Sequence, residues 1–499
     1  MKGIELPVIE AIVRELREGN ASVASEAASM ALRENPQHPG LLALHGISQF
    51  QLGNLDVAEG RLKEALQRGP ATPAIYYHLA LLAEKRELVE VAKQYYEEVL
   101  TLDKSHYPAL LNLGNCLFKS GLYLDAKKCF DKALAMSSDQ RIHKNLGVIG
   151  LETNELQVAE YHFRLALVAA PDWHEAELNL AFSLLKQQRY EEGWSLYESR
   201  LKADSQRQMN APALPRWDYR PDQKILIWTE QGVGDAIMFL SLLPEIMARS
   251  SEVGVLTDER LHSLIRRSFG AHIDLFDSAV HPEILSRYEF QASIESCPQF
   301  FRSSQDDFNG RRAPYIEADP KLKDQLAAEL ENQARGRLKL GVSWRTVNAE
   351  TGERRTIPLE SLLAVLPSDD CLLINLQYGS NDTDLQQCRA KGFSIDHPMG
   401  IDFIRDLDGF AATVAACDYV LTIDNSTAHF AGAIGVPQTV LLPYVCDWRW
   451  GNSSNAIWYE NCHLVRQATR GDWSGPLNKV STAIEALAKA RDGSQSKLY

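Results

Sequence analysis

The chain has 499 residues, a formal net charge of −14, and 45% hydrophobic and 24% charged residues. This balance excludes wholesale disorder, and about 150 residues per domain indicates roughly three domains. The negative charge disfavours a general nucleic-acid binder, because phosphate contacts need surplus Lys and Arg. The longest apolar stretch, Ala236 to Ala248, is too short to cross a bilayer, so we expect no membrane span.

The N-terminal segment and the cysteines predict a cytoplasmic location. Acidic residues interrupt the first segment, MKGIELPVIEAIVREL, where a secretion signal needs an apolar core. The eight cysteines form no CxxC pair, which favours reduced thiols over disulfides or zinc.

The first part of the chain carries an internal repeat. Small residues recur at intervals of 34, 34, 33 and 34 residues, and a second set follows with the same intervals. The first set is Gly46, Ala80, Gly114, Gly147 and Ala181, and the second is Ala58, Ala92, Ala126, Ala159 and Gly193. Four positions after the second set come Leu62, Tyr96, Phe130, Phe163 and Tyr197. This spacing predicts that each unit forms two antiparallel helices that approach closely at the small residues. The large residue would fill the groove against the next unit.

The turns and the number of copies complete this pattern. Gly19, Gly53 and Gly121 fall between the predicted helices, where a turn needs positive φ. A weaker first copy fits residues 5–36. The pattern resembles a tetratricopeptide repeat (TPR) array of about six copies, an all-α solenoid whose concave face usually holds a protein segment.

One helix position of the repeat carries amides. Asn112, Asn145 and Asn179 occupy it in three consecutive units, and His78 occupies it in the unit before. The array resembles that of O-GlcNAc transferases, in which such asparagines grip the acceptor backbone, and an amide both donates and accepts. Asparagine is also common at this position in TPRs generally, so both interpretations stay open.

The second half alternates predicted strands and helices. Apolar runs at Lys224–Thr229 and Val253–Thr257 flank a glycine loop and a helix, in the order of a βαβ unit. A helical connector, Lys321–Gln333, leads to a second series that begins at Leu338–Trp344. Further strands are expected at Cys371–Leu376, Tyr419–Ile423 and Thr439–Leu442. Two Rossmann-like halves predict a cleft with ligands at the carboxyl ends of the strands.

The first glycine loop permits a dinucleotide hypothesis. Gly232 and Gly234 begin a GxGxxG pattern, but Ile237 stands at the third glycine, and Asp258 follows the next strand as a ribose-binding acid would. Asp235 would repel a pyrophosphate at this place, which weakens the hypothesis. A tight strand-to-helix turn explains the glycines whatever the function.

A second segment, Asp418–Trp450, predicts an anion site. A buried strand ends at Asp424, and Asn425 or Ser426 can cap the helix that follows. Free N–H groups there, with the hydroxyls of Ser426 and Thr427, suit a phosphate, and His429 could donate to it. Simple helix capping and a satisfied histidine are the alternatives.

The C-terminal half resembles GT-B glycosyltransferases of the heptosyltransferase type, especially those fused to TPR arrays. The resemblance covers roughly residues 222–485. It depends on the order of five segments: GVGDAIMF, LGVSWR with RRTIPL, LQYG, DNSTAHFAGAIG and LLPYVCDWRWG. Together with the TPRs, the layout is also similar to O-GlcNAc transferases and to TPR-bearing flagellin glycosyltransferases.

The repeat pattern and the resemblance together imply a domain order. The repeats place a TPR superhelix at residues 1–204, followed by a linker at 205–221, and the resemblance places an acceptor-side N-terminal lobe at 222–320. A connector at 321–336 then leads to a C-terminal lobe at 337–490, which binds the nucleotide-sugar donor, and a tail follows at 491–499.

The resemblance also implies roles for residues. Asp235 is the expected general base, which takes the acceptor proton during attack on the anomeric carbon. Gly232 and Gly234 lie on the acceptor side with His78, Asn112, Asn145 and Asn179. The expected donor-binding residues are Ser343, Trp344, Arg345, Gln377, Asp424, Asn425, Ser426, Thr427, His429, Trp448 and Arg449. Arg345 would neutralise the leaving nucleotide, Gln377 would meet its base or ribose, and Trp448 could equally be a buried anchor.

The roles of two arginines and of two aspartate pairs complete the expected site. Arg354 and Arg355 could help at the donor or form a solvated turn. The D-x-D pairs Asp382/Asp384 and Asp406/Asp408 are interpreted as surface or turn aspartates, because a GT-B enzyme needs no metal, so we expect no metal and no cofactor besides the nucleotide sugar.

The sequence thus predicts an α/β GT-B fold after the solenoid, and an inverting, metal-independent glycosyltransferase. A protein acceptor, with flagellin as a candidate, would bind the TPR array and receive the sugar on Ser or Thr. A non-catalytic TPR scaffold with a degenerate GT-B half, a lipid or oligosaccharide acceptor, and an NAD-dependent enzyme remain alternatives.

Overall fold

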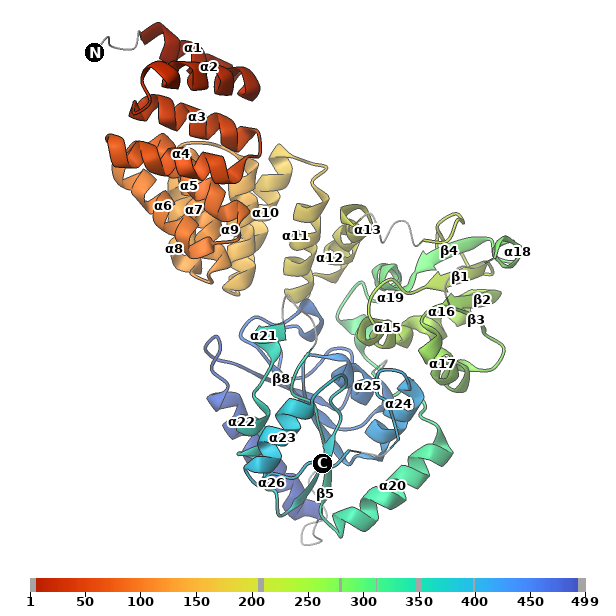
Figure 1. The fold of residues 1–499 in the computed structure, drawn as a ribbon. Helices are drawn as coiled ribbons and strands as arrows, with labels where there is room; N and C mark the ends of the chain where they lie inside the picture. Colours follow the sequence, from red (N-terminus) through yellow and green to blue (C-terminus); the bar gives the residue numbers. More distant parts are fainter. Residues whose placement is uncertain are drawn as a thin grey trace. The chain divides into compact units, whose positions relative to one another are not determined.

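A computed structural model describes residues 6–204, 211–277, 281–310, 312–346, 352–397 and 400–491 (Figure 1). The chain divides into two compact units. One contains Met1–Thr153 with Tyr161–Pro171, and the other contains Asn154–Glu160 with Asp172–Tyr499. The predicted linker lies partly outside the described residues, at 205–210, as does nearly all of the predicted tail, at 492–499.

The first unit is an array of paired helices. Its helices are α1 (Leu6–Arg17), α2 (Ala21–Glu34), α3 (Pro39–Gln51), α4 (Leu55–Arg68), α5 (Pro73–Lys85), α6 (Val89–Leu102), α7 (Tyr107–Lys119), α8 (Tyr123–Leu134), α9 (Gln140–Glu152) and most of α10 (Leu156–Ala169). The last pair, α11 (His174–Lys186) and α12 (Tyr190–Tyr197), belongs to the second unit together with α13 (Arg200–Ala203). The final predicted repeat therefore packs with the C-terminal half of the chain.

The small residues of the repeat serve close helix contact, as the spacing predicts. A Cβ atom on Gly114 would lie 2.6 Å from a ring atom of Phe130, and one on Gly147 would lie 2.6 Å from Phe163. Each of these rings therefore covers the small residue of its own repeat. The sequence had placed the ring against the next unit, so the structure adds a contact within the repeat.

The turns between paired helices need left-handed backbone. Gly19, Gly53 and Gly121 have φ of +83°, +83° and +73°, as predicted. Glu87, Asn154 and Gln188 take φ near +60° at the corresponding turns without the help of glycine.

Two parallel sheets form most of the second unit. The first has the order β3-β2-β1-β4, and the second has the order β6-β5-β7-β8-β9. The strands are β1 (Lys224–Trp228), β2 (Glu252–Leu256), β3 (Asp274–Phe276), β4 (Phe290–Ser293), β5 (Leu338–Val342), β6 (Cys371–Asn375), β7 (Tyr419–Ile423), β8 (Gln438–Leu442) and β9 (Cys462–Arg466). Their apolar runs suit strands that are covered on both faces.

Helices connect and cover these strands. They are α15 (Val233–Phe239), α16 (Leu243–Arg249), α17 (His262–Phe269), α18 (Pro282–Leu285), α19 (Pro298–Phe301), α20 (Pro320–Ala334), α21 (Gly352–Arg355), α22 (Leu359–Leu363), α23 (Asp382–Ala390), α24 (Leu407–Ala416), α25 (Ser426–Ile434) and α26 (Ser474–Arg491). The predicted connector corresponds to α20. Strands β3, β4 and β9 are short or mixed in polarity, and the sequence did not predict them.

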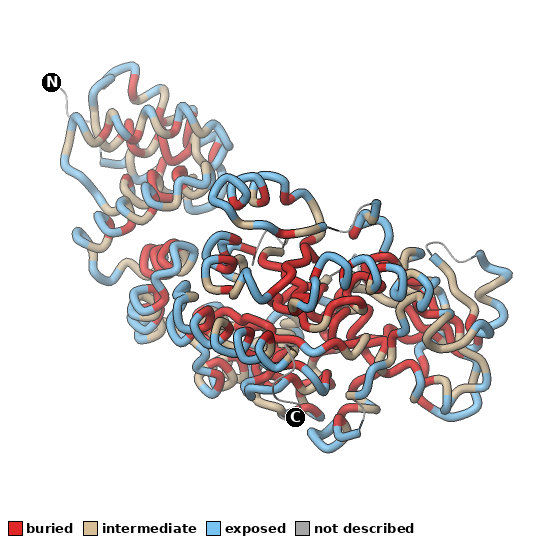
Figure 2. Tube along the Cα trace, turned by 90° about the horizontal axis from the view of Figure 1, so that it is seen from below, coloured by how far each residue is buried: buried red, intermediate tan, exposed pale blue. Residues whose placement is uncertain are grey.

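One apolar core joins the parts of the second unit. It includes Trp194 and Tyr197 of α12, Ile227 of β1, and Ala428 and Phe430 of α25 (buried residues are red in Figure 2). The two sheets and the last helix pair are thus one packed body, in which α15 and α25 are in direct contact. All eight cysteines are free thiols.

Candidate functional site

The candidate site lies where strands of the two sheets end. In each sheet the strand order reverses next to a central strand. The reversal lies between β1 and β4 in the first sheet and between β5 and β7 in the second. Such switch points are where open α/β sheets bind ligands. The glycine loop after β1 and the Asp424–Asn425 turn after β7 both lead directly into a helix, α15 and α25.

Gly234 allows these two helices to meet. A Cβ atom at this position would lie 3.1 Å from Cδ2 of His429 and 3.2 Å from Oγ of Ser426. Gly232 caps α15 and has open space where a Cβ would be. The close contact between α15 and α25 therefore requires glycine at position 234 and not at position 232.

The predicted base, Asp235, is paired with Arg449, which lies in a short 3-10 turn after β8 of the other sheet. Nε of Arg449 lies 2.7 Å from Oδ1 of Asp235, and Nη1 lies 2.8 Å from Oδ1 of Asp447. Arg449 also donates to Oε1 of Gln231, at 3.0 Å. Burial raises the pKa of Asp235, although Arg449 opposes the shift. Arg449 was predicted to bind the donor, and in this structure it holds the candidate base.

A second ion pair lies within electrostatic range of the first. Nη1 of Arg355 is 3.2 Å from Oδ2 of Asp424, and Nε1 of Trp450 donates to Oδ1 of Asp424 at 2.7 Å. Burial raises the pKa of Asp424, and Arg355 opposes this. Burial alone would also raise the pKa of Asp447, but Arg449 and Arg355 hold it below its usual value. We call Asp235, Arg355, Asp424, Asp447 and Arg449 the cleft cluster.

Gln377 and Asn425 tie the strand ends together. Oε1 of Gln377 accepts hydrogen bonds from Oγ of Ser343 (3.2 Å) and from the backbone N–H groups of Trp344 (3.1 Å) and Arg345 (2.9 Å). The amide of Asn425 caps α25 through the N–H of Thr427 and donates to Oγ of Ser343. Gln377 is 1% exposed and Asn425 is 6% exposed. Both amides therefore position the loops. Because the amide of Gln377 is not exposed, it is not available for the contact with the nucleotide base that the resemblance implies.

Trp344 and Arg345 share one acidic partner. Nε1 of Trp344 donates to Oδ2 of Asp384 at 3.0 Å, and Nη1 of Arg345 lies 3.5 Å from the same oxygen. Asp408 pairs with Arg267, and Asp406 caps α24. Three aspartates of the two D-x-D pairs thus have structural partners. Among the described residues, no three His, Cys, Asp or Glu side chains gather as a metal site would need.

His429 is held as a neutral ring. Its Nδ1 lies 2.8 Å from the hydroxyl of Tyr459, and its ring stacks on Trp450. Burial lowers the pKa of His429 to about 3, so the ring carries no charge near neutrality. Ser426 is half-buried, and Oγ1 of Thr427 is fully buried without a hydrogen bond to any described residue. A cationic phosphate contact from His429 is therefore disfavoured.

Trp448 anchors the last helix pair to the second sheet. It is 7% exposed and packs edge-to-face on Trp194 and Tyr197, with ring centroids 5.2 and 5.6 Å apart. Of the two interpretations of Trp448, the contacts favour the buried anchor. The hydroxyl of Tyr197 also accepts a hydrogen bond from Gln231, directly before the glycine loop.

The amide positions of the repeat differ in their partners. Asn112 donates to the hydroxyl of Tyr96 at 3.0 Å, and Asn145 donates to the side chain of Asn115 at 2.9 Å. His78 bonds to the carbonyl of Ala74. These residues and Asn179 of α11 are all half-buried, so each still presents part of its side chain to solvent.

The sequence did not single out a buried acid cluster beside the glycine loop. Nε of Arg200, in α13, lies 2.5 Å from Oε1 of Glu230, and Ser293 bonds to both Glu230 and Glu295. Burial, followed by the Glu230 charge, raises the pKa of Glu295 to about 7. The only sequence signal was that both acids follow predicted or actual strand ends.

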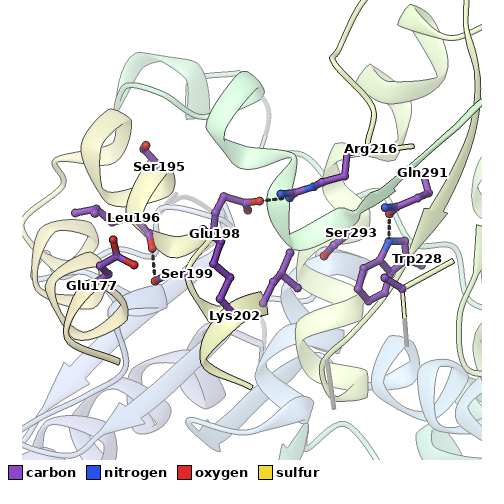
Figure 3. A pocket seen from close by; sticks show the side chains of 12 residues that line it. Glu177, Ser195, Leu196, Glu198, Ser199, Lys202, Arg216, Trp228, Gln291 and Ser293 are labelled. Atoms are coloured by element: carbon purple, nitrogen blue, oxygen red, sulfur yellow. Dashed lines mark hydrogen bonds and ion pairs between the residues drawn. The ribbon is translucent and has the colours of Figure 1, made fainter. Parts of the chain in front are cut away.

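A pocket of about 520 Å³ adjoins this region (Figure 3). Its walls come from α11, α12, α13 and the segment at Arg216, and from β1 and β4, with Glu177, Glu198 and Lys202 on the helical side and Trp228, Gln291 and Ser293 on the sheet side. Arg216 pairs with Glu198 across it. The pocket is therefore built jointly by the repeat and the first sheet.

The fold defines the class of the protein: a TPR solenoid followed by an α/β half with parallel sheets. The tetratricopeptide repeat family model matches residues 43–107 and 111–172. The chain is 29% identical to Protein FlbA of Caulobacter vibrioides over 404 residues, which are 75% of this chain and 66% of FlbA. It is 24% identical to the type IV pilus assembly protein PilF of Pseudomonas aeruginosa over 151 residues, 29% of this chain and 59% of PilF. The chain thus spans less than two thirds of either relative.

Solved structures of TPR proteins match parts of this chain. YrrB, described as a TPR protein with an unusual peptide-binding site, is 18% identical, with a TM-score of 0.31, over 35% of this chain and 90% of YrrB. The C-terminal part of a TPR protein from Cytophaga hutchinsonii is 14% identical, with a TM-score of 0.35, over 47% of this chain and 85% of that one. In the part of the chain that the structure describes, no helix combines the length and apolar character that crossing a membrane requires.

Proposed function

We propose that the protein is a glycosyltransferase that moves a sugar from a nucleotide donor to Ser or Thr hydroxyls of a protein, with flagellin as one candidate acceptor. The TPR array would bind the acceptor, and the two-sheet half would carry out the transfer. The observation that carries this proposal is the place of Asp235. It follows a strand end and a glycine loop, is only a quarter exposed, and faces charged residues of the second sheet.

The proposed step is a direct displacement. Asp235 takes the proton from the acceptor hydroxyl while that oxygen forms its bond to the anomeric carbon. The bond from the anomeric carbon to the donor phosphate breaks, and the nucleotide leaves with the electron pair. Arg355 and Arg345 are the cations near the strand ends that would offset the developing phosphate charge. For Asp235 to accept the proton, Arg449 must release part of its hold on the carboxylate.

The test compares Asp235→Asn with Asp258→Asn in the native host. Asp258 also follows a strand, but its carboxylate pairs with Arg260, so it is a matched acid outside the cleft cluster. We expect the intact mass of a co-purified acceptor protein to show a sugar-sized increment with wild type and Asp258→Asn. The Asp235→Asn strain should lose the increment, with transfer reduced at least about a hundredfold for loss of a general base.

A scaffold is the second candidate, because Asp235 is already paired with Arg449 and the amides of Gln377 and Asn425 are occupied. In that case a partner would co-purify with all three forms and carry no increment in any of them. An increment that persists in Asp235→Asn would remove Asp235 from the proposed chemistry.

A further inference from the structure

Three acids and two arginines meet where the last helix pair joins the first sheet. The acids are Glu198, Glu230 and Glu295, and the arginines are Arg200 and Arg216. Nε of Arg200 lies 2.5 Å from Oε1 of Glu230, and its Nη1 lies 2.8 Å from Oε1 of Glu198. Glu198 also pairs with Arg216. If all five groups were ionised, one negative charge would be left over, and a single proton would balance it.

Ser293 indicates where that proton lies. Its Oγ is 2.8 Å from Oε2 of Glu295 and 3.1 Å from Oε1 of Glu230. A hydroxyl has one proton, so it can donate a well-aligned hydrogen bond to only one of these oxygens. Oε1 of Glu230 also accepts from Arg200, as an ionised carboxylate does. Both contacts of Ser293 are hydrogen bonds when Glu295 is protonated and donates to Ser293, which in turn donates to Glu230.

The surroundings favour this protonated state. The side chain of Glu230 is 1% exposed, and Glu295 is fully buried. Burial, followed by the Glu230 charge, raises the pKa of Glu295 to about 7, because two ionised carboxylates repel each other in a site without water. Tyr197 and Cys297 also face the cluster, and burial raises the pKa of both, so neither carries a charge near neutrality.

Glu230 begins the glycine loop, residues 230–235, which ends at Asp235. The backbone N–H of Glu230 donates to Oε1 of Glu295 at 3.3 Å, so its main chain and its side chain both depend on the pair of acids. The next residue, Gln231, accepts a hydrogen bond from Arg449 at 3.0 Å, and Arg449 pairs with Asp235. A displacement of Glu230 would therefore also move Gln231 and the guanidinium that holds Asp235.

We propose that Glu230 and Glu295 share one proton and that this proton fixes the position of the glycine loop. When the pH rises and the proton leaves to solvent, the two carboxylates repel each other and the loop loosens. Ser293 lines the pocket of Figure 3, through which the proton can exchange with solvent. Glu230 and Glu295 are thus positioning residues, and their effect on Asp235 as a base rests on the proposed glycosyltransferase function.

The first measurement is hydrogen exchange of residues 229–236 in the full chain, followed by mass spectrometry between about pH 5.5 and pH 8.5. Glu295→Gln is the neutral mimic, because its amide can donate to Ser293 and accept from the N–H of Glu230 as the protonated acid does. Glu283→Gln removes an exposed acid of α18 in the same lobe and serves as the control.

The three forms should exchange alike below about pH 6, where Glu295 keeps its proton. Above about pH 7.5, the loop of wild type and of Glu283→Gln should exchange at least about fivefold faster than that of Glu295→Gln. Comparison at the same pH removes the intrinsic pH dependence of exchange.

Infrared difference spectra test the proton itself. The spectrum of wild type minus Glu295→Gln should contain the carbonyl stretch of a protonated carboxyl group at about pH 5.5, and this band should be lost by about pH 8.5.

A pH profile of sugar transfer tests the link to Asp235. The assay uses the acceptor protein and a nucleotide-sugar extract from the native host. The ratio of transfer by Glu295→Gln to transfer by wild type should rise at least about fivefold between about pH 6 and pH 8.5.

The other outcomes separate the shared proton from the proposed function. Loop exchange that is equal in wild type and Glu295→Gln at every pH, a difference that does not change with pH, or the absence of the carboxyl band would overturn the proposal. Each of these results leaves the glycosyltransferase intact. A transfer ratio that is constant with pH would overturn the effect on Asp235. A pH-dependent loop in a protein that transfers no sugar would support the shared proton and reject the glycosyltransferase.

Discussion

At the residue scale, the site is governed by buried and half-buried charges that pair with one another. Asp235 and Asp424 each have a raised pKa because burial removes water from the carboxylate, and each is restrained by one guanidinium. Removing one partner of such a pair leaves a buried charge uncompensated, which costs more than the pair contributes. The cleft cluster therefore limits what can be substituted without loss of the fold.

Glu295 gives a pH prediction at this scale. Its pKa rises from 4.5 to about 7 because of burial and the nearby Glu230 charge. The folded protein thus keeps a proton that the unfolded chain has already lost, so this group's contribution to the free energy of unfolding falls as pH rises from about 4.5 to about 7. Glu295→Gln should remove that fall. Denaturant melts should show the variant gaining stability relative to wild type across this window.

Arg200 and Glu230 belong to the same cluster. The quantity to compare is therefore the difference in the free energy of unfolding between Glu295→Gln and wild type at each pH. A constant difference from about pH 4.5 to 7 would contradict the assigned titration of Glu295.

At the scale of elements, the contact between α15 and α25 decides how the two sheets meet. Gly234 is the position where the helices touch, and Gly232, two residues earlier, has free space and an ordinary negative φ. The two glycines of the predicted GxG therefore have different roles in the structure. One allows a close approach, and the other only begins the helix.

Gly234→Ala should lower the free energy of unfolding by ~1–3 kcal/mol, because its Cβ would press on His429 and Ser426. Gly232→Ala should change it much less. Thermal melts of both variants provide the measurement, and equal effects at the two positions would show that the helices do not meet at Gly234.

At the scale of the whole molecule, the last helix pair is part of the α/β half. Trp194 and Tyr197 pack in the core of this half. The hydroxyl of Tyr197 also accepts a hydrogen bond from Gln231 before the glycine loop, and Arg200 of the following α13 pairs with the buried Glu230. The domain boundary predicted at residue 204 follows the repeat pattern, whereas the compact second unit already begins near residue 154.

A fragment from Asn154 to Tyr499 should therefore fold cooperatively. A fragment that begins at residue 205 should be strongly destabilised, since Glu230 would lose its buried cation and Trp448 its aromatic partners. Circular dichroism melts of the two fragments test this. Two similar cooperative transitions would place the boundary at 204 after all.

Much of the fold could be predicted because its signals are local. The 34-residue spacing of small residues predicted the helix pairs, and apolar runs located β1, β2, β5, β6, β7 and β8 to within a residue or two at each end. Strands β3, β4 and β9 were missed because short strands with mixed polarity have no clear period. The candidate base, Asp235, came from the resemblance to GT-B glycosyltransferases, and its place after a strand and a glycine loop agrees with that role.

The sequence by itself determined the repeat, the alternation of strands and helices, and the residues that end the strands, because each depends on neighbours a few positions apart. Only the tertiary structure decided that Arg449 meets Gln231, 218 residues away, and Asp235 beside it. It also decided that the amide of Gln377 is buried, that His429 is neutral, and that Ser293 lies between Glu230 and Glu295. These properties depend on which side chains exclude water from one another, and such contacts between distant segments are set by packing rather than by local spacing.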